Sequence, residues 1–240
     1  MDDLYTVELD PVGPHLATVV WLHGLGQDAD TLVPVARRLG LPGAGVRGVF
    51  PRAPALAAGQ VTGGPARAWY DQRVFTLDRL DLDGLFAAEQ RLTALLRAET
   101  DRIGPGRTVL AGFSQGATTA LAVALRHPGR LAGLALYAGF LPEVLEPVLA
   151  ATRSPAAARL PVWLGHGVED WVVPVTTGER LRDTLTGWGH PVSWQRYRAG
   201  HRPFAGVTAS LPRFLGRTLG IERLQSVPVR RRPGPPPGGR

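Results

Sequence analysis

Short apolar runs alternate along this chain with longer segments whose apolar residues recur at helical spacing. A strand that is buried on both faces has the first pattern, and the helices that cover it have the second. The alternation therefore predicts an α/β fold with a mostly parallel sheet and helices on both faces. The expected strands are His15–Leu22, Val46–Phe50, Thr108–Ala111, Leu131–Tyr137, Val162–Gly165 and Val192–Tyr197, and the expected helices are Asp30–Leu39, Asp83–Asp101, Gln115–Arg126, Val175–Gly187 and Phe204–Leu219.

Two segments show neither pattern. Residues 51–65 are rich in proline and glycine without periodicity, which predicts a surface loop. After Leu224 the chain consists largely of Pro, Arg and Gly and is too poor in apolar residues to pack. We therefore expect a single domain over residues 1–224 and a disordered tail over residues 225–240.

Composition narrows the classes of function. The chain has no cysteine, which excludes disulfides, thiolate metal sites and a cysteine nucleophile. Its net charge is +7, but four of the arginines lie in the last eleven residues and the body shows no basic stripe with interleaved aromatics, so no specific nucleic-acid partner is expected. The acidic start and the lack of a long apolar stretch predict a cytoplasmic protein with no membrane span. The oligomeric state is left open.

The segment Gly112-Phe113-Ser114-Gln115-Gly116 follows an expected strand and opens an expected helix. A G-x-S-x-G in that context is the nucleophile elbow of the α/β-hydrolase fold, in which a tight turn exposes a serine hydroxyl. The flanking glycines allow the neighbouring backbone to approach closely. Ser114 is therefore the predicted nucleophile, and it requires a base and a group that orients the base.

Candidates for the base and the acid follow Ser114 in the order that this fold uses, acid before histidine. His201 lies just beyond the expected strand Val192–Tyr197, at the sheet edge that presents functional loops, whereas His190 lies in a turn before that strand. Glu169 and Asp170 both follow the strand Val162–Gly165, and spacing alone leaves both open.

The oxyanion that forms during acyl transfer requires two backbone N–H donors. The N–H after the nucleophile, that of Gln115, supplies one, and the loop His23-Gly24-Leu25-Gly26 supplies the other, with Leu25 as the candidate. His23 precedes the elbow and is expected to support this loop. The segment Gly43-Ala44-Gly45-Val46-Arg47-Gly48 matches a dinucleotide fingerprint but leads into a strand, so we interpret it as a turn.

Taken together, several spaced segments resemble the phospholipase/carboxylesterase family, which includes acyl-protein thioesterases and small bacterial carboxylesterases. The matching segments are residues 22–28, 51–54, 68–71, 112–116, His166-Gly167 with Asp170 and Val173-Pro174, and Gly200-His201. The resemblance implies an α/β-hydrolase fold, a Ser114, Asp170 and His201 triad, and an oxyanion hole formed by the amides of Leu25 and Gln115. It also implies that Trp69 lies near the acyl pocket, a substrate-binding position.

The expected activity is hydrolysis of carboxylic esters, or of thioesters, with short to medium acyl or small aromatic groups. Small residues over 51–67 predict a shallow pocket, unless residues after Leu141 fold over the site as a cap. The same triad would serve a lysophospholipase, an acyl-protein thioesterase or an amidase, and the fold could also serve a non-catalytic receptor. The partner is a small-molecule ester, and the sequence implies no cofactor and no metal.

Overall fold

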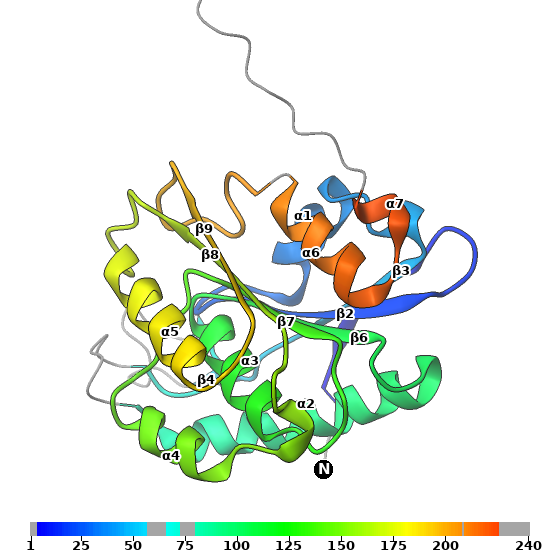
Figure 1. The fold of residues 1–240 in the computed structure, drawn as a ribbon. Coiled ribbons are helices and arrows are strands. Elements are labelled where there is room, and N and C mark those ends of the chain that lie inside the picture. Colours follow the sequence, from blue (N-terminus) through cyan, green and yellow to red (C-terminus); the bar gives the residue numbers. More distant parts are fainter. Residues whose placement is uncertain (1–3, 57–65, 73–79, 208, 226–240) are drawn as a thin grey trace, which may run out of the picture.

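The computed structural model describes residues 4–56, 66–72, 80–207 and 209–225 (Figure 1). Its centre is a seven-stranded sheet in the order β1-β3-β2-β6-β7-β8-β9. Strand β1 runs antiparallel to β3, and the other neighbouring strands are parallel. The strands are β1 (Thr6–Leu9), β2 (Ala17–Leu22), β3 (Val46–Pro51), β6 (Thr108–Phe113), β7 (Gly133–Tyr137), β8 (Val162–Gly167) and β9 (Val192–Tyr197).

Helices cover both faces of this sheet. On one face lie α2, α3, α4 and α5, and on the other lie α1, α6 and α7 (Figure 1). Each set buries an apolar core of its own against the sheet because the central strands are apolar on both sides. The helices are α1 (Val33–Arg38), α2 (Leu82–Ile103), α3 (Gln115–Arg126), α4 (Leu145–Thr152), α5 (Val175–Gly187), α6 (Ser210–Leu219) and α7 (Glu222–Gln225).

The predicted α/β architecture with a mostly parallel sheet is confirmed, and some boundaries differ. Part of the segment predicted as a loop forms a short strand, β4 (Ala55–Leu56), which pairs antiparallel with β5 (Ala66–Arg67). The expected helix over Phe204–Leu219 begins only at Ser210, because Phe204 adopts a left-handed φ of 49° that no α-helix accommodates. Residues 57–65, and all of the predicted tail except Gln225, lie outside the described residues.

Strand order places the carboxyl ends of the parallel strands at one edge. The chain moves from β2 to β3 in one direction across the sheet and from β6 to β9 in the other. In open α/β sheets, ligands bind at the carboxyl edge where the direction reverses. Strands β2 and β6 lie side by side at this reversal, with Leu22 opposite Gly112, so the predicted elbow after β6 lies there.

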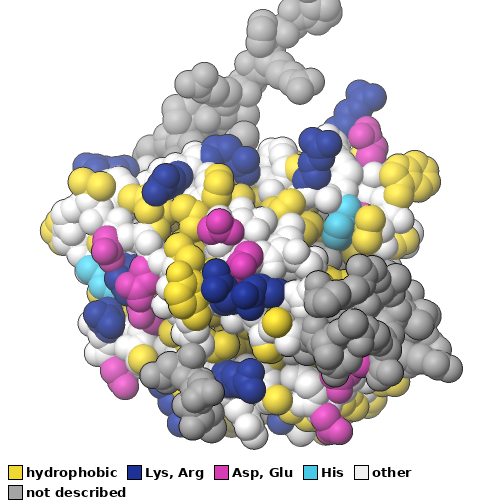
Figure 2. Space-filling model, turned by 180° about the vertical axis from the view of Figure 1, so that it is seen from behind, with side chains coloured by type: hydrophobic (Ala, Val, Ile, Leu, Met, Phe, Trp, Pro, Cys, Tyr) yellow, Lys and Arg dark blue, Asp and Glu magenta, His cyan; other side chains and the backbone are white. Residues whose placement is uncertain are grey.

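The surface charges and the helices concern the predictions that the protein has no specific nucleic-acid partner and no membrane span. On the face shown in Figure 2, basic side chains lie singly or in small groups among acidic and apolar ones rather than as one continuous stripe. None of the helices in the described ranges combines the length and the apolar character that a membrane span requires.

Candidate active site

Ser114 lies at the turn between β6 and α3. Its φ of 54° and ψ of −121° are values that a residue with a side chain adopts only when its surroundings impose them. Its N–H donates to the carbonyl of Tyr137 on β7 (3.0 Å). A Cβ on Gly112 would lie 2.3 Å from the carbonyl oxygen of Gly116, and one on Gly116 would lie 2.3 Å from that of Leu22. The tight packing of this turn therefore holds Ser114 at the carboxyl edge of the sheet.

Three of the predicted site side chains meet in a chain of hydrogen bonds. His201, in the loop after β9, has its Nε2 3.0 Å from the Oγ of Ser114. Its Nδ1 lies 2.7 Å from the Oδ2 of Asp170, in the loop after β8. The carboxylate is buried, whereas part of the imidazole reaches solvent. In this geometry a histidine can take the serine proton while the acid holds its other nitrogen.

The surroundings of Asp170 keep it ionised. Burial alone would raise the pKa of Asp170, but the hydrogen bonds from His201 and from the N–H groups of Val173 and Val172 outweigh it and lower the pKa. The two N–H groups donate to Oδ1 at 2.8 and 3.0 Å. His166 lies 3.7 Å from Oδ2, and its Nε2 bonds the carbonyl of Val173 (2.8 Å). Burial lowers the pKa of His166, so this second histidine remains neutral.

The alternatives that the sequence left open lie elsewhere. Glu169 is at the surface, where its Oε1 lies 3.1 Å from the Nε of Arg198. His190 is buried in the turn between α5 and β9, with its Nδ1 3.1 Å from the carbonyl of Leu160. Of the two acids and the two histidines, the structure thus brings Asp170 and His201 to Ser114.

The loop after β2 holds Leu25 between two fixed peptides. The N–H of Gly24 donates to the side-chain oxygen of Gln27 (2.9 Å), and the N–H of Gly26 donates to the carbonyl of Arg67 on β5 (2.9 Å). Both neighbours of Leu25 are therefore anchored, one within the loop and one to the β4–β5 pair. A donor that is fixed before substrate arrives is what stabilisation of an oxyanion requires.

Gln115 opens α3, where backbone N–H groups have no acceptor within the helix. A Cβ on Gly116 would lie 2.4 Å from the carbonyl oxygen of His23, so the start of α3 directly contacts the start of the loop that carries Leu25. The two predicted oxyanion donors therefore belong to segments packed against each other beside Ser114.

Trp69 is buried behind this contact. Its backbone N–H donates to the Oε1 of Gln115 (2.9 Å), and its indole N–H donates to the carbonyl of His23 (2.8 Å). The Nε2 of Gln115 in turn donates to the carbonyl of Tyr70 (3.1 Å) and to the Oε1 of Gln72 (2.9 Å). Only 2% of Trp69 is exposed, and its hydrogen bonds connect Gln115 to the loop that carries Leu25. Its contact with substrate stays a prediction.

His23 supports the loop, as the sequence indicated. The backbone N–H of Ala53 donates to its Nε2 (3.1 Å), which leaves the ring proton on Nδ1, directed at the carbonyl of Gly24 (2.8 Å). Burial lowers the pKa of His23, so both bonds are made by the neutral ring.

Sequence reasoning missed an ion-paired cluster around Asp28. Its two carboxylate oxygens lie 2.7 Å from the Nε of Arg52 and 3.0 Å from the Nε of Arg67. Burial alone would raise the pKa of Asp28, but the N–H of Ala29 and the two guanidinium groups lower it. The cluster connects the loop after β2 to the segments after β3 and at β5. Asp28 and Arg52 belong to segments quoted for the family resemblance, which was the available signal.

The loop that carries His201 is anchored to the core by Phe204. This side chain is fully buried among aromatic rings, and the loop accepts two hydrogen bonds next to it. The hydroxyl of Tyr137 donates to the carbonyl of Ala205 (2.7 Å), and Arg38 of α1 donates to the carbonyl of Phe204 (3.0 Å). Helix α1, strand β7 and the aromatic core thus fix the loop that holds the imidazole.

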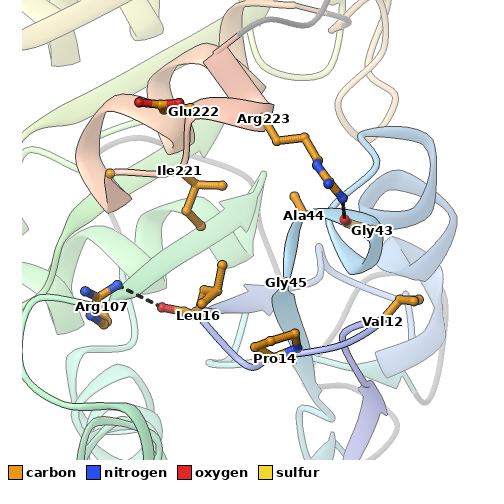
Figure 3. A pocket seen from close by; sticks show the side chains of 11 residues that line it. Val12, Pro14, Leu16, Gly43, Ala44, Gly45, Arg107, Ile221, Glu222 and Arg223 are labelled. Atoms are coloured by element: carbon orange, nitrogen blue, oxygen red, sulfur yellow. Dashed lines mark hydrogen bonds between the residues drawn. The ribbon is translucent and has the colours of Figure 1, made fainter.

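A hollow of about 560 Å³ lies at the opposite edge of the sheet, beside the starts of β2, β3 and β6 (Figure 3). Arg107 at its rim donates to the carbonyl of Leu16 (3.1 Å), and Arg223 donates to that of Gly43 (2.7 Å). No serine or histidine lines it, so it carries none of the predicted site residues. Within the described ranges, no three or more His, Asp or Glu side chains gather where they could hold a metal ion.

The fold and the site define a class of protein. In the α/β-hydrolase serine hydrolases, the nucleophilic serine lies at a strand-to-helix turn, and an aspartate and a histidine follow it at the ends of later strands. Ser114, with its positive φ, Asp170 and His201 have this arrangement. The chain belongs to the phospholipase/carboxylesterase family, whose model matches residues 6–217. The family predicted from the spaced motifs is thereby confirmed, and the protein is a carboxylesterase-type serine hydrolase.

Some relatives are named acyl-protein thioesterases and others carboxylesterases. Acyl-protein thioesterase 1 of Schizosaccharomyces pombe is 33% identical over 210 residues, which cover 87% of this chain and 90% of the relative. A probable carboxylesterase of Oryza sativa subsp. japonica is 29% identical over 187 residues, 75% of this chain and 68% of the relative. The crystal structure of Zea mays acyl-protein thioesterase 2 superposes with a TM-score of 0.76 at 30% identity and covers 90% of this chain and 99% of that one.

Proposed function

We propose that the protein hydrolyses carboxylic esters with short to medium acyl or small aromatic groups through an acyl-enzyme intermediate on Ser114. The observation that carries this proposal is the hydrogen-bond chain from the Ser114 hydroxyl through His201 to the buried carboxylate of Asp170. A serine hydroxyl is too weak an acid to attack a carbonyl unaided, and this chain supplies the base and its orienting group.

In the first half of the reaction, Ser114 Oγ attacks the ester carbonyl while His201 Nε2 takes its proton. The C–O bond to the alcohol then breaks, and the imidazolium gives that proton to the departing alcohol, which leaves an acyl group on Oγ. Asp170 keeps the Nδ1 proton of His201 in place and stabilises the imidazolium.

In the second half, water replaces the alcohol. His201 takes a proton from the water, the hydroxide adds to the acyl carbon, and the acid departs as Oγ recovers its proton. In both halves the negative oxygen of the tetrahedral intermediate accepts hydrogen bonds from the amides of Leu25 and Gln115. Loss of one such donor typically costs about 10²–10³-fold in turnover.

The packing of α4 supports the short to medium acyl preference. Selection of a long acyl chain requires burial of its methylenes, at about 0.8 kcal/mol for each CH₂. Residues after Leu141 were the alternative source of a cap that would complete a channel. Leu145 and Leu149 are instead buried in the core on the α2 and α3 side, and Val148 packs partly against that core. These apolar side chains are therefore engaged in the fold.

The proposed nucleophile is tested with Ser114→Ala and a matched serine change, Ser193→Ala on strand β9. Ser114→Ala is expected to abolish hydrolysis of p-nitrophenyl butyrate and labelling by a fluorophosphonate probe, with the thermal unfolding midpoint preserved. Ser193→Ala should keep both activities. Retention of more than a few per cent of turnover by purified Ser114→Ala would reject the nucleophile.

The acyl preference is tested with p-nitrophenyl acetate, butyrate, octanoate and palmitate below their micelle-forming concentrations. We expect kcat/KM to reach its maximum at or below octanoate. A steady rise through palmitate would instead favour a thioesterase or a lysophospholipase that binds long acyl chains. Of these two, the thioesterase is the alternative that the names of the relatives support. Comparison of a matched thioester and amide with the ester would then identify the leaving group.

We also propose that the protein acts in the cytoplasm, as the sequence analysis predicts. Fractionation of cells that express the untagged chain tests this location. Recovery of the ester hydrolase activity from an exported fraction would contradict it.

A further inference from the structure

Three apolar side chains are exposed on the loop that carries Asp170. Trp171 is 93% exposed, Val168 is 47% exposed and Val172 is 55% exposed. Single exposed apolar residues are common on protein surfaces, but an indole is usually mostly buried, and here three apolar side chains are exposed within five residues. We refer to residues 168–172 as the Trp171 loop.

Hydrogen bonds fix the Trp171 loop in place. The N–H of Val168 donates to the carbonyl of Tyr197 (2.8 Å), and the N–H of Glu169 donates to the carbonyl of Ala199 (3.0 Å). Further along, the Oδ1 of Asp170 accepts from two following N–H groups. The backbone of the loop is therefore fixed while its apolar side chains are exposed to solvent.

Arginines flank the loop on the neighbouring segment. Arg196 lies 3.6 Å from Glu179, Arg198 lies 3.1 Å from Glu169, and both guanidinium groups are largely exposed. Ion pairs at such exposed positions are weak and exchange readily for other anions. Arg202 is also exposed.

We propose that the Trp171 loop docks the protein on an anionic phospholipid surface, with Trp171 at the interface and the flanking arginines at the headgroups. An indole that is almost fully exposed has no opposing wall, so it cannot enclose a small substrate, whereas a broad surface can cover it. Its apolar body and N–H donor suit the boundary between lipid and water. Anionic headgroups match the arginines beside it.

Docking in this orientation has a geometric consequence for the site. The Trp171 loop follows β8, and Ser114 follows β6, so both lie at the carboxyl edge of the same parallel sheet. The exposed part of His201 belongs to this edge as well. A surface bound at Trp171 would therefore lie beside the opening of the site, and an amphiphilic ester could reach Ser114 directly from it.

The test is sedimentation of the full chain with vesicles of ether-linked phosphatidylcholine and phosphatidylglycerol, which contain no carboxylic ester to hydrolyse. We expect Trp171→Ala to reduce partitioning at least tenfold and Trp171→Phe to restore part of it. Val12→Ala is the matched control, because Val12 is 74% exposed at the opposite edge of the sheet and should have no effect. High salt screens the arginines of the tail and those beside the loop alike, so total partitioning should fall while the difference between wild type and Trp171→Ala stays visible.

Three results would each overturn the proposal. The first is absence of binding by the wild-type chain, and the second is equal binding by wild type and Trp171→Ala. The third is a raised KM of Trp171→Ala on a soluble, monomeric ester without vesicles, which would make Trp171 a substrate contact. The vesicle measurement requires no turnover. A negative vesicle result would therefore not contradict the proposed esterase activity, and an inactive protein could still be tested for binding to vesicles.

Discussion

Gly116→Ala should displace the backbone of the active site and lower turnover while the protein still folds. A Cβ at this position would lie 2.3 Å from the carbonyl oxygen of Leu22 and 2.4 Å from that of His23. Ordinary non-bonded contacts lie at about 3.5 Å, so α3 or the end of β2 must move by about 1 Å. The methyl group meets backbone atoms, which cannot rotate away as a flexible side chain could.

The displacement falls on the segment that leads into Leu25. A shift of about 1 Å at a positioned catalytic group can cost about 10²-fold in rate, the factor that also accompanies loss of one oxyanion donor. This corresponds to about 2.7 kcal/mol in activation free energy. Overpacking of a well-filled site typically costs about 1–3 kcal/mol of folding stability, so the variant should still fold.

The assay measures kcat and KM on p-nitrophenyl butyrate together with thermal unfolding. Gly187→Ala is the control, because it introduces the same methyl group at the end of α5, where nothing lies within 4 Å. Gly187→Ala should keep full activity and equal or higher stability. A folded Gly116→Ala protein that keeps more than about half of the wild-type kcat would refute the reasoning.

Three further predictions concern the acid, the pH dependence and the tail. Asp170→Asn should lower turnover roughly 10⁴-fold while Glu169→Gln changes it little, and the reverse order in steady-state kinetics would move the acid to Glu169. The pKa of Asp170 is lower in the folded protein, so its carboxylate stabilises the fold above its unfolded pKa of about 3.9 and that stability is lost as pH falls through the folded pKa. Urea unfolding of Asp170→Asn should therefore show a flatter decline in unfolding free energy between about pH 5 and pH 3, and an unchanged slope would contradict this. Deletion after Gln225 should leave hydrolysis of neutral esters unchanged, which a drop in kcat/KM would disprove.

Elements with strong local patterns were predicted well. The bounds of α3, α5 and β9 agree with the structure because their periodicity and end signals lie within the element itself. Strand β1 was missed because its four residues are only partly buried, and it becomes a strand through pairing with β3, some forty residues further along the chain. Helix α4 was missed because it is short and Pro147 lies in its first turn, where proline is tolerated.

Ser114 and His201 could be predicted from the sequence because each follows a strand and the order of nucleophile, acid and histidine along the chain is fixed by the fold. The choice between Glu169 and Asp170 could not be made from the residues alone, since both positions satisfy the spacing. The structure separates them by burial and by the direction of each carboxylate. The side-chain contacts of Gln115 join segments more than forty residues apart, and no local pattern reports such contacts.

Strand β6, which leads into Ser114, lies between β2 on one side and β7, β8 and β9 on the other, so the site residues come from both sides of it. The base and the acid come from loops after β8 and β9, whereas Leu25 and Trp69 come from segments beside β2 and β5. Exchange of residues 52–72 between relatives would therefore replace Trp69 and the β4–β5 pair that anchors Gly26, and it would leave Ser114, Asp170 and His201 unchanged. Modular construction of this kind gives an evolving enzyme a route to new substrates without a new reaction.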